Sequence, residues 1–346
     1  MKLHVLSSAT AISFAIATTI VASATAPAAQ AQTRITVPGA GPQHFPSMIT
    51  SLPLGRFYLL DTREEGGEPL SILGGYDVLN HMIGENWFPS STAQVVNYPA
   101  SIGMVSGSMS APVVDDAVEI GRRDLDEKIR RSLENGETTV VIAGLSQGTL
   151  VINRELAYLA DDPHAPPPGS LTFVMFSSPE IGLANIYLPV GTTLPIINYT
   201  VHDLADSQYD VSVVYHQYEF WSDFPDRPWN LLAVVNSFFS MAYYHNNTAM
   251  SLPDDAVVVS SRTNEMRGTT TTYMIPSDTV PMLKPLQQLG VPARVVDWIN
   301  AGLKPAIDSG YSRLAPDAGP TSHTESSPAL LSCPRRTTRM PRQGGS

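Results

Sequence analysis

The sequence has very little cysteine: Cys333 is the single one among 346 residues. An internal disulfide is therefore excluded, and so is the class of small secreted domains that several disulfides hold together. A chain of this length buries enough apolar side chains to be stabilised by its own core. We therefore expect a fold that depends on hydrophobic packing, which suits a protein of the bacterial envelope.

Motifs that mark cofactors and nucleic-acid binding are also missing. The sequence contains no Cys/His spacing of a zinc site, no glycine-rich phosphate loop and no dinucleotide fingerprint. Basic residues are outnumbered, with 21 Lys and Arg against 32 Asp and Glu and a net charge of -11. Such a chain repels nucleic acid, and its scattered acidic residues indicate a solvated surface rather than a metal site. We expect no metal, no organic cofactor and no nucleic-acid partner.

The N-terminus has the pattern of a secretory signal. Met1 and Lys2 precede a mostly apolar stretch over residues 5–24, which is followed by Ala29-Gln30-Ala31. This order of a basic start, a short apolar core and a small-x-small site predicts a signal peptide over residues 1–31. The alternative is an uncleaved membrane anchor, and either one places the protein outside the cytoplasm, secreted or in the cell envelope.

Composition divides the remainder into three segments. Residues 32–55 are rich in Pro and Gly and predict an extended lead-in. Residues 56–313 alternate between strand and helix patterns, and their length suits one large domain. Residues 314–346 contain much Pro, Ser, Thr and Gly and few apolar side chains, so we expect a disordered tail.

The hydrophobic pattern of the domain alternates between a period of two and a helical period. The expected strands cover residues 56–60, 94–99, 138–143, 171–176, 194–201 and 211–218. The expected helices cover residues 112–135, 149–159, 229–243 and 291–307. This alternation predicts an α/β fold with a mostly parallel central sheet and helices on both faces.

A candidate nucleophile follows one of these strands, which is a continuous β-branched run. Residues 138–143 form a β-branched run, and Gly144-Leu145-Ser146-Gln147-Gly148 stands between it and a helical pattern. Strand, sharp turn and helix are the setting of a nucleophile elbow in an α/β hydrolase, where Gly144 and Gly148 leave room for the strained backbone. The Gln147 main-chain N–H would then face the oxyanion at the helix N-terminus. We therefore expect Ser146 to be the nucleophile of a serine hydrolase or acyltransferase.

In this fold the acid and then the histidine follow the serine along the chain, which excludes His44 and His81 as the base. The histidines after Ser146 are His164, His202, His216, His245 and His323. We expect His164 in a surface loop and His216 on a strand facing solvent. His202 follows a strand end and is a less favoured candidate for the base. His245 lies in a polar cluster after a helix, where functional residues are common.

Three carboxylates after an expected strand are candidates for the acid. Glu219, Asp223 and Asp226 lie among aromatic residues and prolines that would shield them from water. Shielding strengthens the carboxylate–imidazole hydrogen bond that fixes the histidine tautomer. Asp226 precedes an expected helix and fits a helix N-cap. The spacing does not choose between Glu219 and Asp223.

Several stretches in a fixed order resemble the PE-PPE domain of mycobacteria and related actinobacteria. They are Gly144 to Gly148, YEFWSDFP at 218–225, PWNLLA at 228–233, Asn236, YYH ending at His245, TYMIPSDTVPMLKPLQQL at 272–289 and AIDSGYSR at 306–313. The resemblance covers residues 56–313 and implies a cutinase-like serine hydrolase. A signal peptide in place of a PE or PPE leader is typical of stand-alone exported members.

The resemblance also implies roles for individual residues. By position, Ser146 matches the nucleophile, Asp223 the triad acid and His245 the base. Glu219 stands where the family usually has Asp, and this departure favours Asp223 over the alternative acid Glu219. The oxyanion hole would combine the Gln147 N–H with a donor in the loop after the first strand, near Thr62.

Three functions fit this interpretation. The leading one is an esterase or lipase in which Ser146 takes a fatty acyl group and water releases it. The second is an acyltransferase of the envelope that passes the acyl group to a sugar such as trehalose. The third is a catalytically inactive lipid-binding protein. The expected substrate is an acyl ester or glycolipid, with peripheral contact to the cell envelope, and residues 229–244 line an acyl channel or belong to the core.

Overall fold

The computed structural model describes residues 32–40, 75–106 and 109–322. The predicted signal peptide, the expected strand at 56–60, Thr62, His44, His323 and Cys333 all lie outside these residues. None of the helices in the described ranges is both long and apolar enough to cross a membrane.

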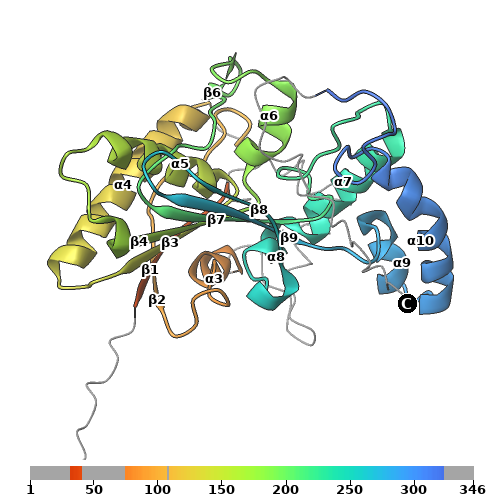
Figure 1. Cartoon of the computed structure of the whole chain (residues 1–346), viewed down its shortest axis with the longest axis horizontal. Coiled ribbons are helices and arrows are strands. Elements are labelled where there is room, and N and C mark those ends of the chain that lie inside the picture. Colours follow the sequence, from red (N-terminus) through yellow and green to blue (C-terminus); the bar gives the residue numbers. More distant parts are fainter. Residues whose placement is uncertain (1–31, 41–74, 107–108, 323–346) are drawn as a thin grey trace, which may run out of the picture. The chain divides into compact units, whose positions relative to one another are not determined.

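The described residues are organised around a seven-stranded sheet with the order β2-β1-β3-β4-β7-β9-β8 (Figure 1). The strands are β1 (Thr33–Val37), β2 (Thr92–Val95), β3 (Val140–Leu145), β4 (Leu171–Phe176), β7 (Asp210–His216), β8 (Val257–Thr263) and β9 (Thr269–Ile275). Neighbouring strands are parallel except for β8, which pairs antiparallel with β9 at the sheet edge. The prediction of an α/β-hydrolase-type fold with a mostly parallel sheet is confirmed.

Helices cover both faces of this sheet (Figure 1). The longer helices are α3 (Gly75–Met82), α4 (Val114–Glu134), α5 (Gln147–Asp161), α7 (Leu231–Tyr243) and α10 (Ala293–Asp308). Shorter elements are α6 (Leu183–Tyr187), α8 (His245–Thr248), α9 (Lys284–Gln288) and the hairpin of β5 (Thr193–Leu194) and β6 (Tyr199–Thr200). Helices α4 and α5 lie on one face of the sheet, whereas α3 and α8 lie on the other.

The two faces of the central strands form separate cores. Ile142 and Phe173 point to the face of α4 and α5, in a cluster with Leu125 and Leu156. The strand residues that alternate with them, such as Phe176, pack with α3 on the opposite face. Because both faces of β3 and β4 are buried, these strands have continuous apolar runs, and this is why the sequence pattern located them.

The first strand lies inside the segment predicted as an extended lead-in. β1 pairs with both β2 and β3, so residues 33–37 belong to the sheet and the domain begins earlier than the expected boundary at residue 56. The hydrophobic pattern did not mark this strand because it contains polar residues that are nevertheless buried. Arg34, for example, is only 2% exposed. Its guanidinium donates to the carbonyl of His81 at 2.8 Å and also contacts Ser91. Both terminal nitrogens of this buried arginine have hydrogen-bond acceptors inside the protein, although arginine in a sequence normally indicates a surface position.

One further expectation about a strand was wrong, and one pair of strands was missed. Residues 194–201 form the short β5–β6 hairpin in place of one strand, and Asn198 adopts a left-handed backbone with φ of 46° between its two arms. The antiparallel pair β8–β9 was not expected at all. It is rich in threonine and faces partly outward, so neither alternation nor a buried run marked it.

Part of the expected disordered tail is packed against the domain. Arg227, 1% exposed, donates to the main-chain carbonyls of Ser309, Ala315, Pro316, Gly319 and Pro320 at 2.8 to 3.4 Å. The main-chain N–H of Ser322 donates to the carbonyl of Asp226 at 2.8 Å. The prediction of disorder is therefore wrong for residues 314–322, because a buried guanidinium holds their carbonyls; residues 323–346 lie outside the described part.

Candidate active site

Ser146 occupies the sharp turn between β3 and α5. Its backbone has φ of 55° and ψ of -121°, a strained conformation for a residue with a side chain. A Cβ placed on Gly148 would lie 2.1 Å from the carbonyl oxygen of Val37, and one on Gly144 would lie 2.6 Å from Ile152. The turn therefore requires glycine on both sides of the serine, as a nucleophile elbow does.

His245 begins the short helix α8 and contacts Glu219. The His245 Nδ1 and Glu219 Oε1 atoms are 2.9 Å apart, and both side chains are at most 2% exposed. The second carboxylate oxygen of Glu219 accepts from the main-chain N–H groups of Trp221 and Ser222 at 3.1 and 2.8 Å and also from the Ser222 hydroxyl. These contacts hold both the imidazole and the carboxylate in one orientation.

The charge state of Glu219 follows from these partners. Burial alone raises the pKa of a carboxyl group, but the charge and hydrogen bond of His245 and the hydrogen bonds of Ser222 outweigh it and lower the pKa of Glu219. Glu219 is therefore an anion beside His245 over the neutral pH range. An anion at Nδ1 favours the imidazolium that forms when a histidine accepts a proton.

Asp223, the expected acid, has different partners. Its carboxylate forms an ion pair with Arg313, with 2.9 Å between Nε and Oδ1, and it accepts from the main-chain N–H of Tyr218 at 2.6 Å. Burial raises the pKa of Asp223 although Arg313 opposes this. The carboxylate that contacts His245 is thus that of Glu219, the alternative acid, whereas Asp223, the acid that the resemblance favoured, contacts Arg313. The spacing of the two residues contains no signal that separates them.

The structure also corrects the expected role of Asp226. Its carboxylate accepts from the main-chain N–H of Ser312 at 2.9 Å and from the Ser312 hydroxyl. The N-cap of α7 is Asn230, whose side chain accepts from the main-chain N–H of Ala233 at 3.1 Å. Asp226 therefore fixes the segment after α10 rather than the start of α7.

The other described histidines have surroundings unlike that of His245. His164 is exposed in a loop next to Asp162, as expected. His216 does not face solvent as expected: its ring stacks on Tyr244 with 4.6 Å between centroids, and its Nδ1 atom has no hydrogen-bond partner among the described residues. Burial lowers the pKa of His216 to about 4. His216 is therefore neutral at pH 7.

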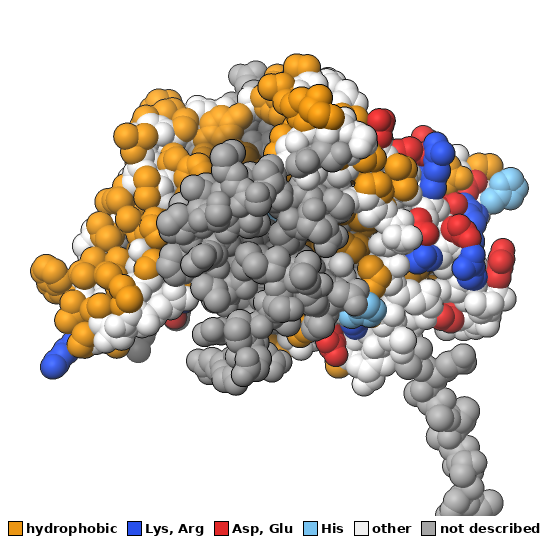
Figure 2. Space-filling view, turned by 180° about the vertical axis from the view of Figure 1, so that it is seen from behind, with side chains coloured by type: hydrophobic (Ala, Val, Ile, Leu, Met, Phe, Trp, Pro, Cys, Tyr) orange, Lys and Arg blue, Asp and Glu red, His pale blue; other side chains and the backbone are white. Residues whose placement is uncertain are grey.

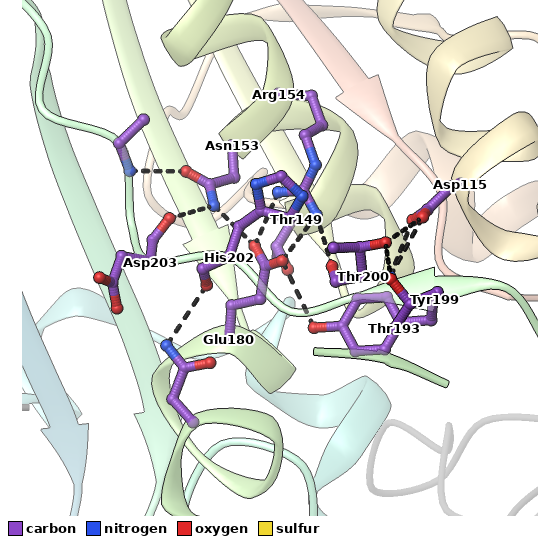
Figure 3. Close-up of polar contacts among 12 residues, drawn as sticks. Asp115, Thr149, Asn153, Arg154, Glu180, Thr193, Tyr199, Thr200, His202 and Asp203 are labelled. Carbon is purple, nitrogen blue, oxygen red and sulfur yellow. Dashed lines mark hydrogen bonds and ion pairs between the residues drawn. The ribbon is translucent and has the colours of Figure 1, made fainter. Parts of the chain in front are cut away.

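His202 belongs to a separate polar network on α5 and the β5–β6 region (Figure 3). The centre of this network is Glu180, 2% exposed, which accepts from Arg154 at 2.8 Å and from Asn153 at 2.6 Å. No pattern in the sequence had marked Glu180 as a functional or buried residue. Burial lowers the pKa of His202, which lines a cavity of about 410 Å³ together with Arg154 and Asp115. The network connects α5 to the loop after β4.

The loop after β1 borders the candidate nucleophile. A Cβ on Gly39 would lie 2.9 Å from the Ser146 Cβ and 3.6 Å from its Oγ, so only glycine fits there without displacement. The hydroxyl of Tyr98, whose ring packs beside Gly121, donates to the carbonyl of Pro38 at 2.5 Å and anchors this loop. On the other side, the Gln147 side chain donates to the carbonyl of Ser101 at 2.8 Å.

Metal binding has no support in this part of the chain. Within residues 32–40, 75–106 and 109–322, no three His, Cys, Asp or Glu side chains are grouped so that they could hold a metal ion.

Comparison with known proteins identifies the family. The model of the PE-PPE domain matches residues 89–312, which include Ser146, Glu219, Asp223 and His245. The chain belongs to the PE-PPE domain family. The family resemblance of the sequence motifs is thereby confirmed.

Three relatives from Mycobacterium tuberculosis illustrate the family. The uncharacterized PPE family protein PPE63 is 50% identical over 289 residues, which are 83% of this chain and 57% of PPE63. The diacyltrehalose acyltransferase Chp2 is 37% identical over 268 residues, 72% of this chain and 73% of Chp2. The esterase PE16 is 30% identical over 204 residues, 58% of this chain and 38% of PE16. This PE-PPE protein thus spans a little over half the length of PPE63.

Proposed function

We propose that this PE-PPE protein is a serine enzyme that takes an acyl group from a lipid ester and releases it to an acceptor. The observation that carries the proposal is the buried contact between His245 and Glu219, in a chain that also presents Ser146 on a strained elbow. Relatives named as acyltransferase and esterase support the same class of chemistry. The catalytically inactive alternative is disfavoured because the chain contains both the elbow with Ser146 and the contact between His245 and Glu219.

In the proposed reaction the Ser146 hydroxyl attacks the ester carbonyl while His245 accepts its proton. The ring nitrogen that accepts it is the one opposite to Nδ1, and Glu219 stabilises the imidazolium. The tetrahedral intermediate then expels the alcohol, which receives the proton from His245, and the acyl group stays on Ser146. In the second half of the reaction His245 deprotonates the acceptor, which attacks the acyl carbonyl, and the Ser146 oxygen leaves and receives the proton from His245.

We assign the acid role to Glu219 rather than Asp223. A triad acid has to touch the histidine that it orients, and in the described structure the carboxylate that does so is Glu219. Asp223 is committed to Arg313 and to the main chain of Tyr218.

We place the oxyanion hole between two main-chain segments. One donor is the N–H of Gln147 at the start of α5, as the sequence indicated. The second comes from the loop after β1 at Gly39 and Ala40, because this loop touches Ser146. The loop around Thr62, which was expected to supply the second donor, followed a strand that lies outside the described residues. Gly39→Val would close the space beside Ser146 and tests this assignment.

The acceptor distinguishes the two candidate activities. Water as acceptor makes the protein an esterase or lipase, and a sugar hydroxyl makes it an acyltransferase. The second candidate is favoured by a specific observation, since the chain matches 73% of the diacyltrehalose acyltransferase Chp2 at 37% identity but 38% of the esterase PE16 at 30% identity. We propose that the enzyme is exported, from its N-terminal sequence, and meets glycolipids of the cell envelope.

The test is incubation of the protein with acyl esters of several chain lengths, with and without trehalose. Free fatty acid as the main product identifies a hydrolase, and acyl trehalose identifies a transferase. A fluorophosphonate probe should label Ser146, and Ser146→Ala should abolish both labelling and turnover. Absence of labelling and turnover in the wild type would overturn the proposed chemistry.

A further inference from the structure

Helix α7 differs from an ordinary surface helix because it buries several polar residues and exposes several large apolar ones. Its fully buried side chains include Asn236, Ser237 and Ser240, each 0% exposed. Its outer side exposes Leu231 by 71%, with Val235 and Phe238 each exposed by 44%. A helix in contact with water normally buries its large apolar residues and exposes its polar ones. This arrangement indicates that the outer side of α7 has an apolar partner.

The three exposed residues lie on one side of the helix. Positions 231, 235 and 238 are separated by four and three residues, a spacing that aligns side chains along one stripe. Trp229, 55% exposed, stands immediately before Asn230, the N-cap of the helix. We call Trp229, Leu231, Val235 and Phe238 the α7 stripe. The helix itself contains no Asp, Glu, Lys, Arg or His, so the stripe offers nothing to a charged partner.

A second helix with exposed apolar residues, α10, contacts α7. α10 packs against α7, and Asn230 donates to the carbonyl of Ala306 at 2.7 Å. On α10, Trp298 is 78% exposed and Val295 is 41% exposed. Figure 2 shows hydrophobic side chains gathered on the side of the molecule that α7 and α10 occupy, whereas charged side chains gather on the opposite side. Exposed tryptophans beside aliphatic residues are typical of surfaces that enter the lipid–water interface.

The stripe is continuous with the candidate active site. The ring of Phe238 lies 5.0 Å from that of Phe220, which in turn lies 4.9 Å from the ring of Trp221. The Trp221 ring lies 6.4 Å from the imidazole of His245. An uninterrupted row of aromatic rings therefore leads from the exposed surface to the proposed base.

We infer that the α7 stripe docks the protein on the surface of an uncharged or zwitterionic lipid aggregate, from which the ester substrate reaches Ser146. This inference rests on the proposed function for its substrate. A lipid surface is favoured over a second copy of the chain because the row of rings connects the stripe to a site for acyl esters. The absence of charge on α7 means that docking depends on apolar contact and changes little with salt concentration.

The test compares two double variants in a Ser146→Ala background, using the protein as exported by its host. Leu231→Ser with Val235→Ser removes part of the stripe. Ile120→Ser with Val258→Ser is the matched control, since these residues are 45% and 60% exposed on α4 and β8. Binding to phosphatidylcholine vesicles is measured by co-sedimentation at low and high salt. We expect the stripe variant to lose at least about tenfold in partitioning, and the control to match its parent.

With Ser146 restored, the activity on a long-chain ester embedded in vesicles is divided by the activity on a soluble short-chain ester. The stripe variant should lower this ratio at least about tenfold, because less enzyme is held at the interface; thermal unfolding monitored by circular dichroism verifies that it is folded. Equal vesicle binding by the stripe variant and its parent would overturn the inference. A wild-type dimer that the stripe variant converts to a monomer, without a change in vesicle binding, would identify a second copy as the partner and also overturn it.

Failure of the proposed function gives a different result. In that case no ester is turned over by any variant with Ser146 intact, while vesicle binding still depends on the stripe.

Discussion

Exchange of the two candidate acids for their amides separates their roles. Glu219→Gln keeps the size of the side chain but removes the negative charge beside His245, and its amide group can present an N–H₂ to Nδ1 and enforce the wrong tautomer. In serine proteases the corresponding change lowers kcat by about 10⁴. We expect a loss of about 10³- to 10⁴-fold, or about 4–5.5 kcal/mol of transition-state stabilisation.

Asp223→Asn should give the opposite pattern. The asparagine oxygen still accepts from the Tyr218 N–H, so Glu219 and His245 keep their positions and kcat stays within about tenfold of the wild type. The Arg313 guanidinium, 20% exposed, loses its ionic partner. Removal of one member of a mostly buried ion pair costs about 2–4 kcal/mol of folding stability. The two amide variants are therefore each other's control.

The assay is kcat on p-nitrophenyl butyrate, measured well below the melting temperature of both variants, together with urea unfolding. Glu219→Gln should be folded and nearly inactive, and Asp223→Asn should be active and less stable. A folded Asp223→Asn variant that loses about 10³-fold in kcat, beside an active Glu219→Gln variant, would refute the assignment of the acid.

Three further predictions follow from buried groups. Gly148→Ala should cost at least about 1–3 kcal/mol of stability because its Cβ would lie 2.1 Å from a carbonyl of β1. In the same thermal unfolding experiment the control Gly169→Ala, whose Cβ would have nothing within 4 Å, should keep the melting temperature of the wild type. Burial lowers the pKa of His216 to about 4 in the folded protein, so the unfolded chain binds a proton more readily than the folded one. The free energy of unfolding should therefore fall by up to about 3 kcal/mol as the pH drops from 6.5 to 4. Urea titrations of His216→Phe should lack this part of the pH dependence. Arg227→Met should cost about 2–4 kcal/mol by leaving carbonyls of residues 309–320 without a donor, whereas Arg123→Met, with a side chain 73% exposed, should stay within about 0.5 kcal/mol.

Local patterns predicted the elements whose surroundings are uniform. β3 and β4 are buried on both faces, and their apolar runs located them to within a few residues. The spacing of apolar residues located α4 and α10 in the same way. The elbow was found because its glycines and the adjoining strand and helix are neighbours in sequence.

Features that depend on distant partners were not predictable in this way. The arginine in β1 looked like a surface residue. Its burial depends on hydrogen-bond acceptors near residues 81–91, about fifty positions further along the chain. Residues 314–322 have the composition of a disordered segment. The guanidinium that orders them belongs to Arg227, which is distant in the sequence. Local composition carries no information about such pairings, so these segments were assigned to a linker and a tail.

The spacing could not separate Glu219 from Asp223 for a more specific reason, since both carboxylates act on the same turn. Tyr218 adopts a left-handed backbone with φ of 71°, and Asp223 holds it by accepting from its main-chain N–H, while the Asp223 N–H donates to the carbonyl of Glu219 at 2.7 Å. Asp223 thereby closes a small loop whose geometry turns the Glu219 side chain toward His245, and Arg313 anchors that loop to the segment after α10. The proposed acid and the residue that positions it are thus two carboxylates four positions apart. Asp223→Ala, which removes the acceptor as well as the charge, should for this reason lower kcat more than Asp223→Asn, and equal kcat values for the two variants would exclude a positioning role for Asp223.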